Sequence, residues 1–233
     1  MAIHDGHRDR IRQRYLRDGL DGFEEHEALE MLLYNCIPRK DTNDLAHRLI
    51  NEFGSLSLVM SATPEQLKKV HGVGDVVANY LPFINDFQRF LFTKRKEADC
   101  KALLSLEECG EYLLPRFLGL RNEAVYMVCL DSKCKILGCK FLGEGSVNSA
   151  SVPIRRIVEQ ALNMNASTVI LAHNHPSGVA LPSGEDVQTT RVLATALHAV
   201  DILLADHFVF SDAEFISMRI SNYFTDEDIL SGL

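Results

Sequence analysis

Two histidines one residue apart, His173 and His175, are the side chains in this sequence best placed to bind a metal ion. They follow residues 168–172, a short apolar run typical of a buried strand. Alternate residues of an extended chain point the same way, so the two imidazoles can share one cation. Pro176 prevents further strand pairing, which places both rings at the exit of the strand, where the sites of α/β proteins commonly lie.

A helix is predicted to begin shortly after these histidines, and its first turn offers a third ligand. Pro182 and Ser183 start the helix, and Asp186 lies within its first turn. Two nitrogens and one oxygen suit zinc, which proteins bind in a tetrahedron of four ligands. The same Ser-x-x-Asp pattern is also a variant of the capping box, in which the two side chains only satisfy helix amides. The spacing leaves both interpretations open.

The whole segment, HNHPSGVALPSGED, resembles the JAMM motif of JAB/MPN-domain metalloproteases: His-x-His-Pro, then Ser-x-x-Asp, with ten residues from the first His to the Ser. HNHPSG, PSGED and the later pair of Asp206 and His207 are similar to the RadC family, which is named for DNA repair. The segments GHRDRIRQRYLRDGLDGFEEHEALEMLLY and HGVG resemble the helical region of that family, with its helix-hairpin-helix. The resemblance covers nearly the whole chain.

The resemblance implies a zinc-dependent hydrolase that cleaves peptide or isopeptide bonds in a peptide or protein substrate. One zinc ion per chain would be held by His173, His175 and Asp186, with a water molecule as fourth ligand. Glu123 would be the general base. The Ser183 hydroxyl would help to stabilise the oxyanion of the reaction.

The general base has two candidates. In the family the glutamate lies at the start of the strand that opens the first hairpin of the domain, and Glu123 matches that position before residues 124–130. Glu159 is the other candidate, because it lies in the helix where relatives often have Pro-Arg-Glu. Residues 153–156 of this chain are Pro-Ile-Arg-Arg, so the glutamate of that triplet is missing here. We prefer Glu123. The alternative interpretation is that Glu123 is an exposed carboxylate at the start of a strand, without a catalytic role.

The hydrophobic pattern divides the chain into a helical part and an α/β part. Up to about residue 93, apolar residues recur at three- and four-residue spacing, and the charged residues 94–99 are the predicted linker. With the resemblance, this predicts a small all-α domain over residues 1–97 that contains the helix-hairpin-helix, and an MPN (JAB)-type domain over residues 103–225. The second domain is expected to be α/β, a mixed sheet with flanking helices. Its predicted elements are a hairpin at 123–142, helices at 152–162 and 183–200, and strands at 168–172 and 202–210.

Composition and charge limit the class of protein. The chain has 233 residues, 46% hydrophobic and 24% charged, which is ordinary for a globular protein that folds without disulfides. Six cysteines lack CxxC spacing, and neither a signal-peptide pattern nor a membrane-spanning run is present, so we expect a cytoplasmic protein without membrane contact. Residues 1–97 carry 14 Lys+Arg against 15 Asp+Glu, so the remainder carries −7 of the net charge of −8 and should repel nucleic acid.

Residues 64–81 resemble a helix-hairpin-helix, the predicted contact with DNA. Gly72 and Gly74 permit a tight turn whose backbone amides approach a phosphate, and Lys68 and Lys69 supply positive charge. A Gly-x-Gly turn between helices also occurs as simple turn chemistry, and Pro82 is expected to shorten or kink the second helix. Two rivals to the hydrolase stay open: a DNA-binding repair accessory protein with a vestigial or structural metal site, and a metal-dependent nuclease.

His207 is the remaining histidine of interest, because it follows Asp206 in the last predicted strand. We expect a buried strand histidine bonded to a backbone group, outside the metal ligands. Three cysteines, Cys129, Cys134 and Cys139, recur every five residues, which matches no zinc or redox motif, so we expect small buried side chains rather than ligands.

Overall fold

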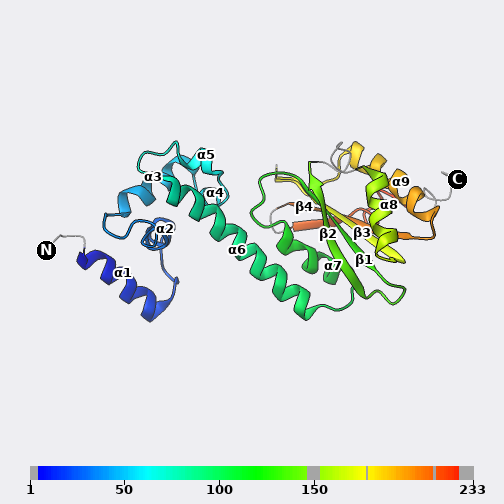
Figure 1. The fold of residues 1–233 in the computed structure, drawn as a ribbon, viewed down its shortest axis with the longest axis horizontal. Coiled ribbons are helices and arrows are strands. Elements are labelled where there is room, and N and C mark those ends of the chain that lie inside the picture. The colour runs from blue at the N-terminus through cyan, green and yellow to red at the C-terminus, as the bar shows by residue number, and fades with distance from the viewer. Residues whose placement is uncertain (1–4, 146–152, 177, 212–213, 226–233) are drawn as a thin grey trace. The chain divides into compact units, whose positions relative to one another are not determined.

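A computed structural model describes residues 5–145, 153–176, 178–211 and 214–225 of the chain (Figure 1). The chain divides into two compact units, Met1–Gln88 and Arg89–Leu233. The first unit is helical throughout its described residues, and the second is built on one mixed sheet. The structure therefore has the α/β class and the leading helical region that the sequence predicted.

The first unit packs short helices around one apolar core. In α3 (Asn43–Phe53), Leu45 and Leu49 are buried four residues apart, as the sequence pattern predicted. Gly54 ends this helix with a φ of 92°, a left-handed conformation that glycine adopts at little cost. Such stop signals keep the helices short enough to fold back on one another. The other helices of this unit are α1 (Asp5–Asp18), α2 (Glu25–Leu33), α4 (Leu56–Met60), α5 (Pro64–Leu67) and the first part of α6 (Asp75–Asp99).

α6 is longer than the sequence predicted. Residues 94–99, expected as a linker, form its last turns, and Pro82 lies inside the helix without ending it. The charged end stays helical although it lacks apolar periodicity, because Glu97 pairs with the buried Arg116 at 2.9 Å. A contact with a distant part of the chain therefore overrides the local pattern. Among the described residues, no helix has both the length and the apolar character needed to cross a membrane.

The second unit contains a five-stranded sheet with the strand order β2-β1-β3-β4-β5. The predicted hairpin is present, because β1 pairs with β2 in antiparallel fashion. β3 and β4 are the parallel pair, and the other neighbouring strands are antiparallel. The short β5 is an addition that the sequence analysis did not predict. The strands are β1 (Ala124–Leu130), β2 (Ile136–Glu144), β3 (Thr168–Asn174), β4 (Leu203–Ser211) and β5 (Glu214–Ser217).

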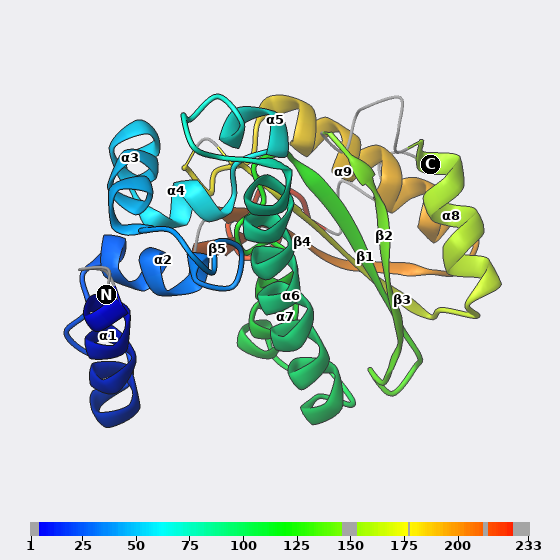
Figure 2. The same cartoon turned by 60° about the vertical axis from the view of Figure 1, so that its left-hand side comes forward.

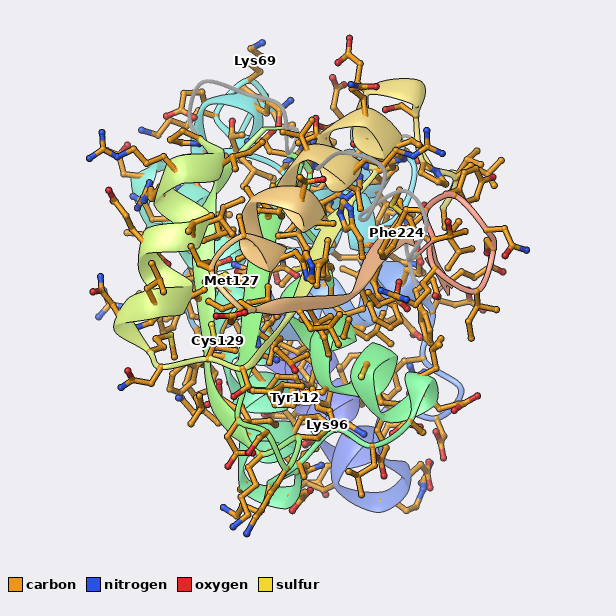
Figure 3. The ribbon with its side chains drawn as sticks, turned by 90° about the vertical axis from the view of Figure 1, so that its right-hand side faces the viewer. Lys69, Lys96, Tyr112, Met127, Cys129 and Phe224 are labelled. Atoms are coloured by element: carbon orange, nitrogen blue, oxygen red, sulfur yellow. The ribbon has the colours of Figure 1, made fainter. Side chains whose placement is uncertain are left out.

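Helices cover both faces of this sheet (Figures 1 and 2). α8 (Ile154–Asn163) and α9 (Gly184–His198) pack on one face, where Met127 and Cys129 of β1 are fully buried (Figure 3). α7 (Leu106–Leu113) and a following 3-10 turn pack on the other face against a second apolar cluster that includes Phe208 and Phe210. The central strands are therefore buried on both sides, which explains their nearly continuous apolar sequences.

Gly110 in α7 allows this helix to lie close to Phe215 of β5. A Cβ atom at Gly110 would lie 2.1 Å from the tip of the Phe215 ring, which packs against Phe208 and Phe210. We expect Gly110→Ala to destabilise the second unit by about 1–3 kcal/mol, the usual cost of adding a methyl group to a packed core.

Hydrogen exchange of the β3 and β4 amides checks this prediction, because their slowest exchange reports the opening of the second unit. Gly6→Ala in α1 is the control, since a Cβ atom there would meet only the Arg10 guanidinium at 3.4 Å. Unchanged protection of β3 and β4 in Gly110→Ala would show that the close approach is not needed.

Candidate metal centre

The carboxyl end of β3 carries the two histidines. His173 pairs with Val125 of β1 on one side and with Val209 of β4 on the other, so its ring is fully buried. His175 lies just beyond the strand, where its amide still donates to the carbonyl oxygen of Phe210 at 2.8 Å. This last bond holds the exit of β3 against β4. The two imidazoles therefore start from a rigid backbone in the middle of the sheet.

The first turn of α9 brings Asp186 to the same place. Ser183 caps the helix: its Oγ accepts from the Asp186 amide at 3.1 Å, and the Asp186 carboxylate accepts from the Ser183 amide at 2.8 Å. The Ser183 hydroxyl also donates to Asp186 Oδ2 at 2.6 Å. The capping box is therefore real, and the same bonds orient the carboxylate toward the histidines. The capping interpretation of Ser-x-x-Asp is therefore confirmed, and the ligand role of Asp186 stays a prediction.

Two imidazole nitrogens and both oxygens of one carboxylate converge at this point. His173 Nε2 lies 3.0 Å from His175 Nε2 and 3.4 Å from Asp186 Oδ1, and His175 Nε2 lies 3.4 Å from Asp186 Oδ2. Ligands about 2.0–2.1 Å from a tetrahedral zinc ion lie roughly 3.3 Å from one another. Each histidine nitrogen is near this distance from its own Asp186 oxygen, and with one ligand atom per residue the three atoms lie within 4.8 Å of one another, so two nitrogens and one oxygen are a suitable donor set. The triad of His173, His175 and Asp186 therefore fits a metal ion.

Burial and charge both favour a cation at the triad. Asp186 is buried, which by itself raises the pKa of its carboxyl group. When His173 is protonated, its hydrogen bond and positive charge, together with the bonds from Ser183, outweigh burial and hold this pKa well below its usual range. The carboxylate is thus ionised at neutral pH in a region of low polarity. The side chain of His175 remains 15% exposed, so water reaches the triad from its side.

His207 on β4 differs from the expectation of a backbone bond. It is fully buried, and its ring bonds two side chains: Nε2 lies 2.7 Å from His173 Nδ1, and Nδ1 lies 2.6 Å from the hydroxyl oxygen of Thr190 on α9. Burial and the neighbouring His173 lower the pKa of His207 far below its usual value, which keeps the ring neutral. Sequence reasoning missed Thr190, because a threonine in the middle of a helix carries no local signal.

The neighbouring Asp206 has a structural role. Its carboxylate accepts from the His207 amide at 2.7 Å, from the Arg219 amide at 3.1 Å and from the Ser217 hydroxyl. These bonds join β4 to β5 and to the residues that follow it. Burial, partly offset by these bonds, raises the pKa of Asp206.

Glu123 precedes β1 and is half-buried. Asn174, which lies between the two histidines, bonds the backbone on both sides of Glu123. The Asn174 Oδ1 atom accepts from the Ala124 amide at 2.8 Å, and the Asn174 Nδ2 group donates to the Asn122 carbonyl oxygen at 3.2 Å. Val125 and His173 are the end pair of the two antiparallel strands, so Glu123, two residues before Val125, and His175, two residues after His173, both lie beyond the same end of this ladder.

Glu159, the other candidate for the general base, lies on α8. Its carboxylate pairs with Arg155 one helical turn earlier at 2.8 Å, and both side chains are more than half exposed. An exposed pair of this kind is ordinary helix surface chemistry. Among the described residues, the contacts of Glu159 do not connect it with the triad.

The predicted DNA contacts lie in the first unit, at the turn between α5 and α6. Gly72 has a φ of 98°, and a Cβ atom there would lie 3.3 Å from the guanidinium of Arg48 on α3. A Cβ atom at Gly74 would meet no atom within 4 Å, so its backbone is open. Lys68 pairs with Asp75 at 2.7 Å, whereas Lys69 extends from the surface (Figure 3). Arg48 is the basic residue that sequence reasoning missed at this turn.

Comparison with known proteins finds a matching family model for residues in each unit. Residues 103–223 match the model of the RadC-like JAB domain, and residues 5–79 match that of the UPF0758 N-terminal region. A UPF0758 protein of Fusobacterium nucleatum subsp. nucleatum is 33% identical over 218 residues, 91% of this chain and 94% of the relative. A UPF0758 protein of Vibrio parahaemolyticus is 37% identical over 207 residues, 88% of this chain and 92% of the relative. One from Photobacterium profundum is 36% identical over 209 residues, 89% and 92% of the two chains.

These matches cover both units, and the triad lies inside the matched JAB domain. The JAB domain has a hydrolase-like fold, and the geometry of its triad is compatible with a metal ion. With relatives above 30% identity along nearly its full length, this chain belongs to the RadC family, the family of the UPF0758 proteins.

Proposed function

We propose that this protein is a zinc-dependent hydrolase of the JAMM type that cleaves peptide or isopeptide bonds. The observation that carries the proposal is the convergence of two imidazole nitrogens and one carboxylate within 3.0–3.4 Å of one another. Structural zinc sites use four protein ligands, whereas catalytic sites use three and keep one position open. Three ligands with a water-accessible side at His175 follow the catalytic pattern.

His173, His175 and Asp186 would hold the ion. When bound, zinc supplies a Lewis acid that lowers the pKa of water to about 7 and polarises a carbonyl group. Glu123 would accept a proton from the attacking water and pass it to the leaving amine. Its support is positional: Asn174 fixes the backbone on either side of Glu123 from the strand that carries both histidines.

Ser183 would assist at the oxyanion. Its hydroxyl donates to Asp186 Oδ2, so the hydroxyl group already lies beside one of the three ligands. To stabilise an oxyanion, the O–H group would rotate away from the carboxylate, which the Ser183 amide would continue to bond. Ser183 would thus act both as the helix cap and as a donor to the substrate.

The ligand set favours amide substrates over phosphodiesters. Enzymes that cleave phosphodiesters with metal ions often use two ions bridged by several carboxylates. Among the described residues, the metal-binding group contains a single carboxylate, Asp186. Residues 98–233, which include the triad, also carry −7 of the net charge of −8, which repels a nucleic-acid backbone. A metal-dependent nuclease is therefore the weaker alternative.

We expect about one zinc ion per chain, lost in His173→Ala and His175→Ala. Each variant removes one of three protein ligands, and zinc affinity falls sharply with an incomplete set. The fold should survive, because large apolar clusters on both sides of the sheet hold the second unit together. Metal analysis together with circular dichroism measures both properties. A wild-type protein that stays metal-free when purified with zinc present would contradict the ligand assignment.

Glu123→Gln is expected to retain zinc and to lose hydrolysis by about 100-fold or more, because the amide cannot accept the proton. Glu159→Gln is the matched control, since this carboxylate pairs with Arg155 on the surface of α8, and it should remain active. Rates on a panel of peptide and isopeptide substrates give the comparison. Loss of zinc in Glu123→Gln, or inactivity of Glu159→Gln instead, would exclude Glu123 as the base.

We also propose that the first unit contacts DNA through the turn before α6. The support is the open backbone at Gly74 and two basic groups beside the turn, Arg48 and Lys69. Lys68 should contribute less than its sequence position indicates, because Asp75 already neutralises it. Binding of this kind would be weak and independent of DNA sequence, because amides and basic side chains read only the phosphate backbone.

For the full chain we expect a log-log salt slope of about 2 to 4 for duplex or branched DNA. Lys69→Glu should lower that slope by about one unit, and Lys68→Glu should lower it less. Lys133→Glu is the control, since this exposed lysine lies in the β1–β2 turn of the other unit. Fluorescence anisotropy at several salt concentrations measures the slopes. Equal effects of all three substitutions would contradict a contact at this turn.

A further inference from the structure

A continuous chain of hydrogen bonds joins two of the three ligand residues through the protein interior. The Thr190 hydroxyl donates to the carbonyl oxygen of Asp186 at 2.6 Å, one turn earlier in α9. The Thr190 oxygen lies 2.6 Å from His207 Nδ1, and His207 Nε2 lies 2.7 Å from His173 Nδ1. His173 Nε2 in turn faces the Asp186 carboxylate. Thr190, His207 and His173 are all fully buried.

The position of every hydrogen in this chain follows from its first member. A carbonyl oxygen only accepts, so the single hydroxyl proton of Thr190 must point toward Asp186. The sulfur of Met218 is the other acceptor near this hydroxyl, but it lies 3.8 Å away and is a weak one. With its proton engaged, the Thr190 oxygen accepts from His207, which places the hydrogen of that ring on Nδ1.

The hydrogen position on His207 then determines which ring nitrogen of His173 carries a hydrogen. A buried, neutral His207 has one N–H group, and with Nδ1 protonated its Nε2 has a lone pair. This lone pair accepts from His173 Nδ1, so the hydrogen of a neutral His173 lies on Nδ1. His173 Nε2 is left with its lone pair directed at the triad. The ring nitrogen that faces His175 and Asp186 is therefore ready to bind a cation.

We propose that Thr190 and His207 are positioning residues that fix the tautomer of His173 for metal binding. The inference rests on the metal site of the proposed function and deepens it. Hydrogen bonds to the second nitrogen of a ligating histidine orient the ring and raise its basicity. The usual partner is a carboxylate or a carbonyl group. Here a neutral histidine takes that place, and a backbone carbonyl sets its tautomer through Thr190.

This relay also couples the two elements that carry the ligands. His173 belongs to β3, whereas Asp186 and Thr190 belong to α9, and His207 on β4 connects them. A shift of α9 would break the Thr190–His207 bond as well as move the Asp186 carboxylate. Losing such a partner of a ligand typically weakens metal binding about 10- to 100-fold. We expect an effect of this size from removing the Thr190 hydroxyl.

Three substitutions on α9 test the relay. Thr190→Val keeps the shape of the side chain but removes the hydroxyl, and we expect the dissociation constant for zinc to rise about 10- to 100-fold. Thr190→Ser restores the hydroxyl and should bind zinc within about threefold of the wild type. Thr195→Val is the matched control, because Thr195 makes the same bond to a carbonyl one turn earlier, that of Arg191 at 3.0 Å, without contacting the relay. Competition with a chromogenic chelator gives the constants.

Imidazole nitrogen-15 NMR of the wild-type protein tests the hydrogen positions without any variant. In the metal-free protein His207 should be protonated on Nδ1 alone, and in the zinc-loaded protein His173 should carry its hydrogen on Nδ1. A hydrogen on His207 Nε2, or equal zinc affinity in Thr190→Val and Thr195→Val, would overturn the relay.

The two proposals fail in different experiments. Tight zinc binding that depends on the Thr190 hydroxyl, combined with no hydrolysis of any substrate, would support the relay and count against the proposed hydrolase. A wild-type protein without affinity for zinc would overturn the role of the relay in metal binding along with the metal site. In that case the NMR result for metal-free His207 would still show whether the hydrogen-bond order is correct.

Discussion

The buried carboxylate of Asp186 is the constraint on which the rest of the centre depends. An ionised group in an apolar interior is costly unless hydrogen bonds and positive charge compensate for the lost water. The capping box of Ser183 supplies the hydrogen bonds, and the two histidines face the remaining lone pairs. A divalent cation held by the triad would supply positive charge directly beside the carboxylate.

The topology of the sheet explains how the chain brings the histidines and Asp186 together. β3 and β4 are parallel, so a crossover must connect the end of one to the start of the other, and α9 is the helix of that crossover. The start of α9 therefore lies near the carboxyl end of β3, which brings Asp186 to His173 and His175. β1 lies on the other side of β3 in antiparallel direction, so its beginning, with Glu123, reaches the same end of the sheet. Asn174 links these two strands at that end.

The sequence predicted the parts of the centre that depend on short spacing. His173, His175, Ser183 and Asp186 lie within one segment, and the hairpin, α8, β3, α9 and β4 all lie close to the predicted ranges. It did not predict the relay, because Thr190 and His207 meet only through the packing of α9 on β4. The linker prediction for residues 94–99 was wrong for a related reason: the partner of Glu97 is Arg116, which a local pattern does not reveal. Glu123 lies at the end of the sheet that carries the histidines, whereas Glu159 pairs with Arg155 on α8; the choice of Glu123 as general base stays a prediction.

X-ray absorption at the zinc edge of the zinc-loaded protein is the sharpest test of whether His173, His175 and Asp186 bind the ion, because it reports which atoms surround it. We expect nitrogen and oxygen ligands at about 2.0–2.2 Å from the ion, with the multiple-scattering signature of two imidazoles. A shell dominated by sulfur at about 2.3 Å would contradict this expectation, since the free cysteines of the chain would then be the ligands. A shell of oxygen alone would contradict it equally, because neither His173 nor His175 would be bound.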